Sequence, residues 1–384
     1  MRRLLFIFSF LSLLVVDGKA QEVETLTLED CLRIGIDNNL SLEGKRKEIQ
    51  KSKYGVSENR SKLLPQITVI AGYNNNFDPP VSVTDGSSYG VPYNITKTLQ
   101  HTANAGLEMQ MPLFNQTLYT SMSIAKVMEE ISRLSYGKAR EDIIMQISKM
   151  YYLGQVTAEQ IVLIKANITR LEELRDITQA FFDNGMSMEV DLKRVNINLE
   201  NLKVQYDNAQ AMMKQQLNML KYIMDYPAEK EIALTPVNTD SITTVALTGL
   251  SENIYELQLS QSQVQLAERQ KKIITNGYIP SLSLTGSWRY AAYTDKGYHW
   301  FHSGPSNQWF RSYGVGLTLR IPIFDGLDKT YKIKKAMIDI ENKRLAWEDA
   351  RKNLQTQYLN AVNDLMNNQR NFKKQKDNYL LAED

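Results

Sequence analysis

The chain has 384 residues, of which 43% are hydrophobic, 9% aromatic and 23% charged, which excludes disorder and collagen. Mean hydropathy is −0.37, and no apolar run approaches the roughly 20 residues of a membrane-crossing helix. Lys and Arg number 45 against 43 Asp and Glu. Positive and negative charges are therefore nearly balanced, and the chain lacks the excess of positive charge that is typical of nucleic-acid-binding proteins.

A secretory signal peptide is predicted over residues 1–20. Two arginines precede the apolar run of residues 4–16, and Gly18 and Ala20 are the small residues that a signal peptidase reads. The run is too short for an anchor helix. We therefore expect the mature chain to start near Gln21 and to cross an inner membrane.

The mature chain is expected to open with a helix capped by Thr27, whose side chain can accept bonds from the first turn. Cys31 lies in that helix and is the single cysteine, so no internal disulfide can form. We interpret Cys31 as a buried structural thiol rather than a lipid-attachment site.

Four stretches of about ten residues alternate apolar and polar side chains and are predicted to be strands: residues 67–74, 105–113, 281–290 and 313–323. Their charged side chains of Asp, Glu, Lys or Arg all fall on the polar parity. An ordinary half-buried sheet alternates too, but this length suits a tilted membrane strand, and aromatic residues cluster at the strand ends. The side chains predicted to face water are Thr68, Glu108, Gln110, Arg289, Thr318 and Arg320.

Four strands cannot close a barrel, and an open sheet edge in hydrocarbon leaves costly unpaired N–H and C=O groups. Several copies of the chain would remove the edges. Two copies give eight strands, and three give twelve, which is wide enough for a water-filled lumen. The sequence therefore predicts an oligomer that exposes its apolar parity to lipid, with a trimer favoured if the function is transport.

Long helices fill most of the remaining chain. Residues 118–183 contain no proline and repeat at helical spacing, residues 192–224 follow a heptad pattern, and a last helix starts near Asp328. Asp183, Asn184 and Gly185 supply a turn after the first helix, and Ser187 is expected to cap the returning one. Helices this long indicate a coiled-coil-like assembly.

The chain contains two repeats of helix, strand, strand and long helix. Leu64-Pro65 and Ile279-Pro280 mark the entry to the first strand of each, and Pro112-Leu113-Phe114 and Pro322-Ile323-Phe324 mark the exit from the second strand. We expect a first repeat over residues 21–250, with a linker near 225–250. The second repeat spans residues 251–384, where 62 residues follow Pro322 and neither a second tip nor a second return helix is found.

These motifs, with the opening residues 26–32 and the turn at 182–185, resemble the TolC family of outer-membrane efflux proteins. The resemblance implies an α+β membrane protein of a Gram-negative outer membrane. Three chains would form a homotrimer with a 12-stranded barrel and a periplasmic barrel of long antiparallel helices. It also implies a passive export conduit that works with a periplasmic adaptor (membrane fusion) protein and an inner-membrane transporter. The tip that would face the adaptor holds Asp183, Asn184, Gly185, Ser187 and Asp191.

The missing second tip means either that the sequence is truncated, which we favour, or that the chain is naturally short and its trimer has a gap. In the family, acidic residues near that tip constrict the tunnel, and no positions correspond to them here. We expect a chain without the last helix to expose an apolar stripe and to assemble poorly.

No catalytic residue, metal ligand set or cofactor site is predicted. The pair His299 and His302 lies in an aromatic loop without a third ligand, and no phosphate-cradling glycine loop is present. The rival hypothesis is a soluble periplasmic coiled-coil scaffold or adaptor. The exported cargo and the class of pump are not specified by the sequence.

Overall fold

The structure is a computed structural model that describes residues 23–85, 87–97, 99–237, 251, 253–294 and 309–383. The predicted signal peptide, His299 and His302, and the second half of the predicted linker lie outside these residues. The chain divides into two compact units, of which the first holds residues 23–44 and 138–237 and the second holds residues 45–137 and the described residues from 251 onward. Among the described helices, none is both long enough and apolar enough to cross a bilayer.

The first unit is built from helices and one short parallel strand pair. Strand β1 (Glu24–Leu26) pairs with β6 (Ile232–Leu234), a contact that the sequence pattern did not predict because three-residue strands leave no measurable alternation. The helices are α1 (Leu28–Asn38), the distal part of α3 (Gln116–Asp183) and α4 (Glu189–Met224). The α3 and α4 bounds agree with the predicted hairpin.

The cap of α1 has the predicted geometry. The Thr27 hydroxyl accepts the Asp30 N–H at 3.2 Å, and the Asp30 carboxylate accepts the Thr27 N–H at 3.3 Å. These two bonds make a reciprocal capping box, which satisfies N–H groups that have no partner inside the helix. The bonds from Thr27, together with Arg33, also hold the pKa of Asp30 below its ordinary value.

The core of the first unit lies where α1 and α4 approach α3. Six side chains are at most 2% exposed: Cys31, Leu42, Ile147, Leu199, Leu220 and Met224. Gly35 of α1 allows this approach, because a Cβ at that position would overlap the Ile147 side chain. The Asn39 amide adds a polar link by donating to the Ile223 carbonyl at 2.8 Å.

Cys31 is fully buried in this core, and burial raises the pKa of its thiol to about 11. The thiolate is the reactive form of cysteine. We therefore expect Cys31 in the folded protein to resist maleimide labelling at pH 8 and to react rapidly once guanidinium unfolds the chain. Mass spectrometry of labelled samples checks this. Stoichiometric labelling without denaturant would contradict the burial of Cys31.

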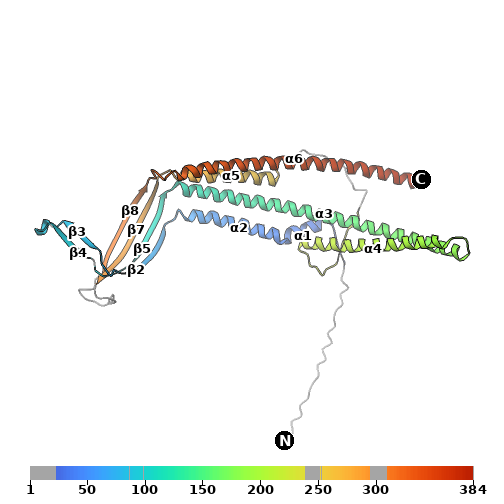
Figure 1. Cartoon of the computed structure of the whole chain (residues 1–384), viewed down its shortest axis with the longest axis horizontal. Coiled ribbons are helices and arrows are strands. Elements are labelled where there is room, and N and C mark those ends of the chain that lie inside the picture. The colour runs from blue at the N-terminus through green and yellow to red at the C-terminus, as the bar shows by residue number, and fades with distance from the viewer. Residues whose placement is uncertain are drawn as a thin grey trace, which may run out of the picture. The chain divides into compact units, whose positions relative to one another are not determined.

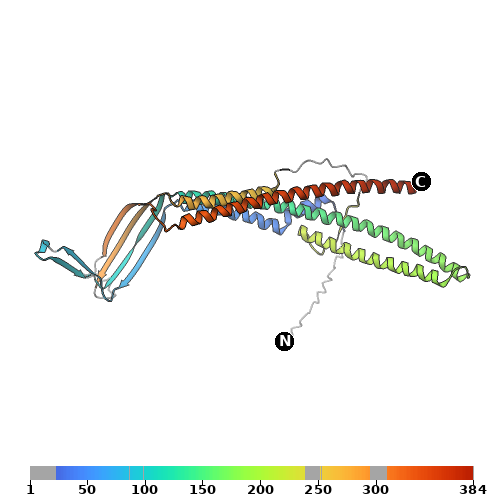
Figure 2. The ribbon, with the colours of Figure 1, turned by 45° about the horizontal axis from the view of Figure 1, so that its top comes forward.

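The second unit contains the same succession of elements twice. The first set is α2 (Leu40–Ser61), β2 (Gln66–Asn75), β5 (His101–Phe114) and α3, and the second is α5 (Tyr255–Asn276), β7 (Ser281–Thr294), β8 (Trp309–Arg320) and α6 (Asp328–Glu383). The four strands continue from the ends of these helices, and α5 and α6 lie side by side (Figures 1 and 2).

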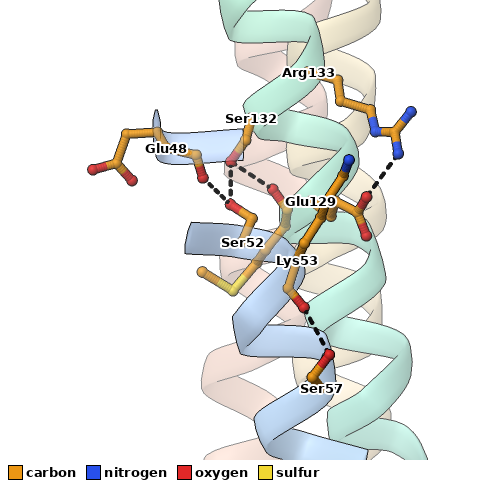
Figure 3. A network of polar contacts seen from close by, with 8 residues as sticks. Glu48, Ser52, Lys53, Ser57, Glu129, Ser132 and Arg133 are labelled. Carbon is orange, nitrogen blue, oxygen red and sulfur yellow. Dashed lines mark hydrogen bonds and ion pairs between the residues drawn. The ribbon is translucent and has the colours of Figure 1, made fainter. Parts of the chain in front are cut away.

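Polar contacts join neighbouring helices of the second unit. Figure 3 shows Ser52 of α2 against Ser132 of α3, with their hydroxyl oxygens 2.6 Å apart, while Ser52 also donates to the Glu48 carbonyl. The Asn276 amide at the end of α5 donates to the Thr120 hydroxyl of α3 at 2.6 Å, and both side chains are buried. Buried polar groups that are paired in this way fix which helix faces meet.

The four long strands form one antiparallel sheet in the order β2-β5-β7-β8. Between β2 and β5, where the sequence suggested only a loop, β3 (Val81–Asp85) and β4 (Tyr93–Lys97) form a separate hairpin. This hairpin lies at the end of the sheet that is remote from the helices (Figure 1).

Candidate functional site

The strand register collects the predicted apolar and polar positions on two opposite faces of the sheet. Directly paired residues share a face, because side chains alternate along each strand. One row across the four strands consists of Val69, Leu107, Trp288 and Tyr313, and the next consists of Thr68, Glu108, Ser287 and Gly314. The apolar positions of all four strands therefore lie on one face of the sheet, and the polar positions lie on the other.

The apolar face is exposed in the single chain. Val69 is 74% exposed, Val315 is 80% exposed and Leu317 is 67% exposed. A contiguous apolar face of this kind marks a surface that meets a partner or a membrane. No layer of described helix or strand covers it.

The polar face carries a hollow of about 460 Å³. Four of the six residues predicted to face water line this hollow: Thr68, Glu108, Gln110 and Arg289. The other two lie on the same face nearer the helices, since Thr318 is paired with Ser283 and Arg320 with Ser281. The structure thus brings all six side chains to one surface.

An ion pair joins the two charged residues in the hollow. Glu108 of β5 contacts the guanidinium group of Arg289 on β7, and both side chains remain partly exposed. Gly106 is the direct cross-strand partner of Arg289, and a Cβ there would lie 2.5 Å from the Trp288 carbonyl oxygen and 2.9 Å from both Cα and Cγ of Arg289, so glycine allows β7 and the Arg289 side chain to lie this close. The arginine side chain crosses the space above Gly106 to reach the carboxylate two residues further along β5.

The two edges of the sheet remain open. Strand β2 is paired only with β5, and β8 only with β7, among the described strands. An exposed edge presents a row of N–H and C=O groups that can pair with another strand. One chain therefore presents two complementary edges but cannot join them itself.

One prediction about the strands is wrong. Strand β8 spans Trp309–Arg320 rather than residues 313–323, so Ile321 and Ile323 lie beyond it, and Arg311 lies within it, two residues before Tyr313 on the apolar parity. Its direct cross-strand partner is Tyr290. The expectation that every charged strand residue falls on the polar parity fails because aromatic-rich residues 309–312 were assigned to the loop.

The α3–α4 tip is a tight turn with the predicted glycine. Gly185 has φ of +72°, and the N–H groups of Gly185 and Met186 donate to the carbonyls of Phe182 and Phe181 at 2.9 and 2.8 Å. Such bonds satisfy the last carbonyls of a helix. The Asn184 amide adds a bond to the Ala180 carbonyl, and the Gln179 amide donates to Asp183.

The predicted cap of the return helix is wrong. Helix α4 begins at Glu189, its N-cap residue is Met188, and no side chain caps it. Ser187 instead donates to the Thr178 carbonyl of α3 at 3.4 Å, because the turn is one residue longer than expected and carries the hydroxyl back toward α3. Asp191 lies in the first turn of α4 and faces Arg194.

Two exposed methionines flank this turn and were missed in the sequence. Met186 is 76% exposed and Met188 is 74% exposed. The sequence does contain a signal for them, because two large apolar residues lie beside a turn glycine, where polar residues are usual. Methionine is adaptable and common at binding surfaces, so these side chains add an apolar contact to a tip that the sequence presented as polar.

Comparisons with known proteins agree with this arrangement. The family model described as "Outer membrane efflux protein" matches residues 34–224. The outer membrane protein TolC of Vibrio cholerae is 21% identical over 319 residues, a match that covers 81% of this chain and 66% of that protein. The chain thus spans just under two thirds of that relative.

Two solved structures show the same fold. The MtrE outer membrane channel of Neisseria gonorrhoeae, in its open state, matches with a TM-score of 0.66 at 19% identity, covering 90% of this chain and 74% of that one. VceC of Vibrio cholerae matches with a TM-score of 0.65 at 13% identity, covering 89% of this chain and 79% of that one.

The fold, with two helix–strand–strand–helix repeats and a four-stranded sheet of two unlike faces, defines an α+β protein of the outer-membrane channel class. The chain resembles the outer membrane efflux protein family over residues 34–224, and this is the TolC family that its motifs resemble. This similarity indicates the outer membrane of a Gram-negative bacterium, with the long helices in the periplasm. Within the described residues, no group of three His, Cys, Asp or Glu side chains could hold a metal ion.

Proposed function

We propose that the protein is the outer-membrane duct of a tripartite efflux or type I secretion system. Three copies would join β8 of one chain to β2 of the next and close a twelve-stranded barrel. The observation that supports this proposal is the register of the sheet, which gathers exposed apolar side chains on one face and charged side chains around a hollow on the other, while both edges remain open. Twelve strands enclose a space that side chains do not fill.

The duct is passive in this proposal. Its polar face would supply a wet path, while an inner-membrane transporter would supply the energy and a periplasmic adaptor would connect the two at the α3–α4 tip. The tip residues Asp183, Asn184, Gly185, Ser187 and Asp191 are candidates for the adaptor contact, together with Met186 and Met188. The six polar strand residues are candidates for the lumen wall.

Fractionation and electrophoresis test the duct directly. The missing last helix led us to expect poor assembly, but strands paired around a closed ring have no free edge. The duct proposal therefore predicts, against that expectation, that the protein sediments with outer membranes and migrates as an SDS-resistant trimer until it is heated. Purified trimers should conduct ions in planar bilayers. Recovery in the soluble periplasm, without conductance, would instead support a coiled-coil scaffold.

The charges in the hollow should set the ion preference of the pore. Glu108→Gln leaves Arg289 without its partner and should shift permeability toward anions, whereas Arg289→Gln leaves Glu108 alone and should shift it toward cations. Reversal potentials in a KCl gradient measure both shifts, which should grow at low salt as the Debye length increases.

A matched control for this pair is Ser287→Ala, which changes a neutral side chain of the same hollow. It should leave the reversal potential unchanged. Exposed ion pairs contribute about 0–1 kcal/mol to stability, so all three variants should still form trimers. Shifts of the same sign for Glu108→Gln and Arg289→Gln would contradict a lumen position for the pair.

A further inference from the structure

We propose that Arg311 and the aromatic rings around it bind the phosphate of a lipid in the outer leaflet of the membrane. This inference rests on the proposed duct, since it needs the apolar face of the sheet to meet lipid. It starts from the residue that breaks the alternation of the sheet: an exposed arginine on the parity of Tyr313, Val315 and Leu317.

Arg311 has no carboxylate partner on its own face. The same-parity residues of β2, β5, β7 and β8 include no Asp or Glu, and a second copy that pairs its β2 with β8 would add none. A charged side chain that faces lipid is costly unless it is paired or reaches the headgroups. No described strand residue on this face supplies the counter-charge, so a lipid phosphate at this position would supply it.

The position of Arg311 along the strand fits the headgroup boundary. Ten residues separate it from Ile321, which directly follows β8. At about 3.4 Å per residue and a tilt of roughly 40°, this stretch rises about 26 Å, close to the ~25 Å height of the apolar band of such barrels. Ile321 then lies at the periplasmic boundary of the hydrocarbon and Arg311 at the outer boundary.

The neighbours of Arg311 are the rings that favour such a boundary. Its guanidinium carbon lies 5.9 Å from the centre of the Tyr313 ring, and Tyr290 is its direct cross-strand partner. The Tyr290 and Trp288 rings meet edge to face, with centres 5.5 Å apart. The Tyr313 ring limits the motion of the Arg311 guanidinium group. The planar N–H donors of that group match the oxygens of a phosphate.

Lipid retention tests the assignment. Wild-type trimers would be reconstituted in nanodiscs with either bisphosphorylated lipid A or the same lipid without its phosphates, and retained lipid would be counted by native mass spectrometry. We expect about tenfold stronger retention of the phosphorylated lipid, and loss of this preference in Arg311→Gln. Arg311→Lys should keep part of it, because lysine retains the charge without the planar donors.

The matched control is Arg320→Gln, which removes an arginine from the polar face of the same strand and should leave lipid retention unchanged. Equal retention by wild type and Arg311→Gln would overturn the inference, as would displacement of lipid A by an equal concentration of inorganic phosphate. Failure of the wild-type protein to form trimers that insert into bilayers would count against the duct itself, so the two failures are distinguishable.

Discussion

Leu317→Arg should prevent assembly of the protein in the outer membrane. Leu317 lies near the middle of β8, is 67% exposed on the apolar face and is paired with Leu284 of β7. An arginine that faces lipid near the bilayer midplane costs about 2–4 kcal/mol, and a closed trimer would contain three of them. Quantitative blots of heated and unheated outer-membrane fractions should show the SDS-resistant trimer reduced to a small fraction of wild type.

The neighbouring residue gives the control. Thr318→Arg introduces the same side chain one position along the strand, on the polar face, and should assemble nearly as well as wild type. The native Arg311 shows that β8 carries an arginine on the apolar parity only near its outer end. Full assembly of Leu317→Arg, or failure of Thr318→Arg alone, would reverse the assignment of the two faces.

The elements predicted correctly from the sequence are those whose apolar residues recur at a regular spacing. Alternation over ten residues identified the four membrane strands, and long helical spacing with a turn glycine predicted the α3–α4 hairpin through to Asp183. These patterns can be recognised in the sequence because one face of each helix or strand lies in the same environment along its whole length. Alternation shows only which side chains share a face, and the residue-by-residue register of the sheet was not predicted.

The features that sequence reasoning missed depend on contacts between distant segments. The β1–β6 pair joins residues about two hundred positions apart through three-residue strands, and Gly106 matters because the Trp288 carbonyl and Arg289 of another strand occupy the space that a Cβ would fill. The start of β8 was misplaced because Trp309 and Phe310 fit an aromatic loop as well as a strand. The direction of the Ser187 hydroxyl depends on the length of the turn, which composition alone does not determine.

Replacing the two tip methionines by aspartate should abolish efflux while leaving the trimer intact. Met186 and Met188 are about three-quarters exposed and lie beside the turn at Gly185, where burial against an adaptor would remove them from water. Burying a side chain of this size contributes about 1.5–3 kcal/mol, so losing two, and placing two charges in the contact, should lower adaptor affinity at least a hundredfold. Cellular accumulation of a pump substrate, and copurification of the adaptor, would measure the loss.

Met186→Leu with Met188→Leu is the matched control, because it keeps the apolar surface and nearly the same volume. This variant should retain efflux and adaptor binding. Both variants should form SDS-resistant trimers, since neither residue packs into the core of the first unit. Normal efflux by the aspartate variant would place the adaptor contact elsewhere on the chain, and loss of efflux in the leucine variant would mean that the turn needs methionine for its own conformation rather than for an apolar partner.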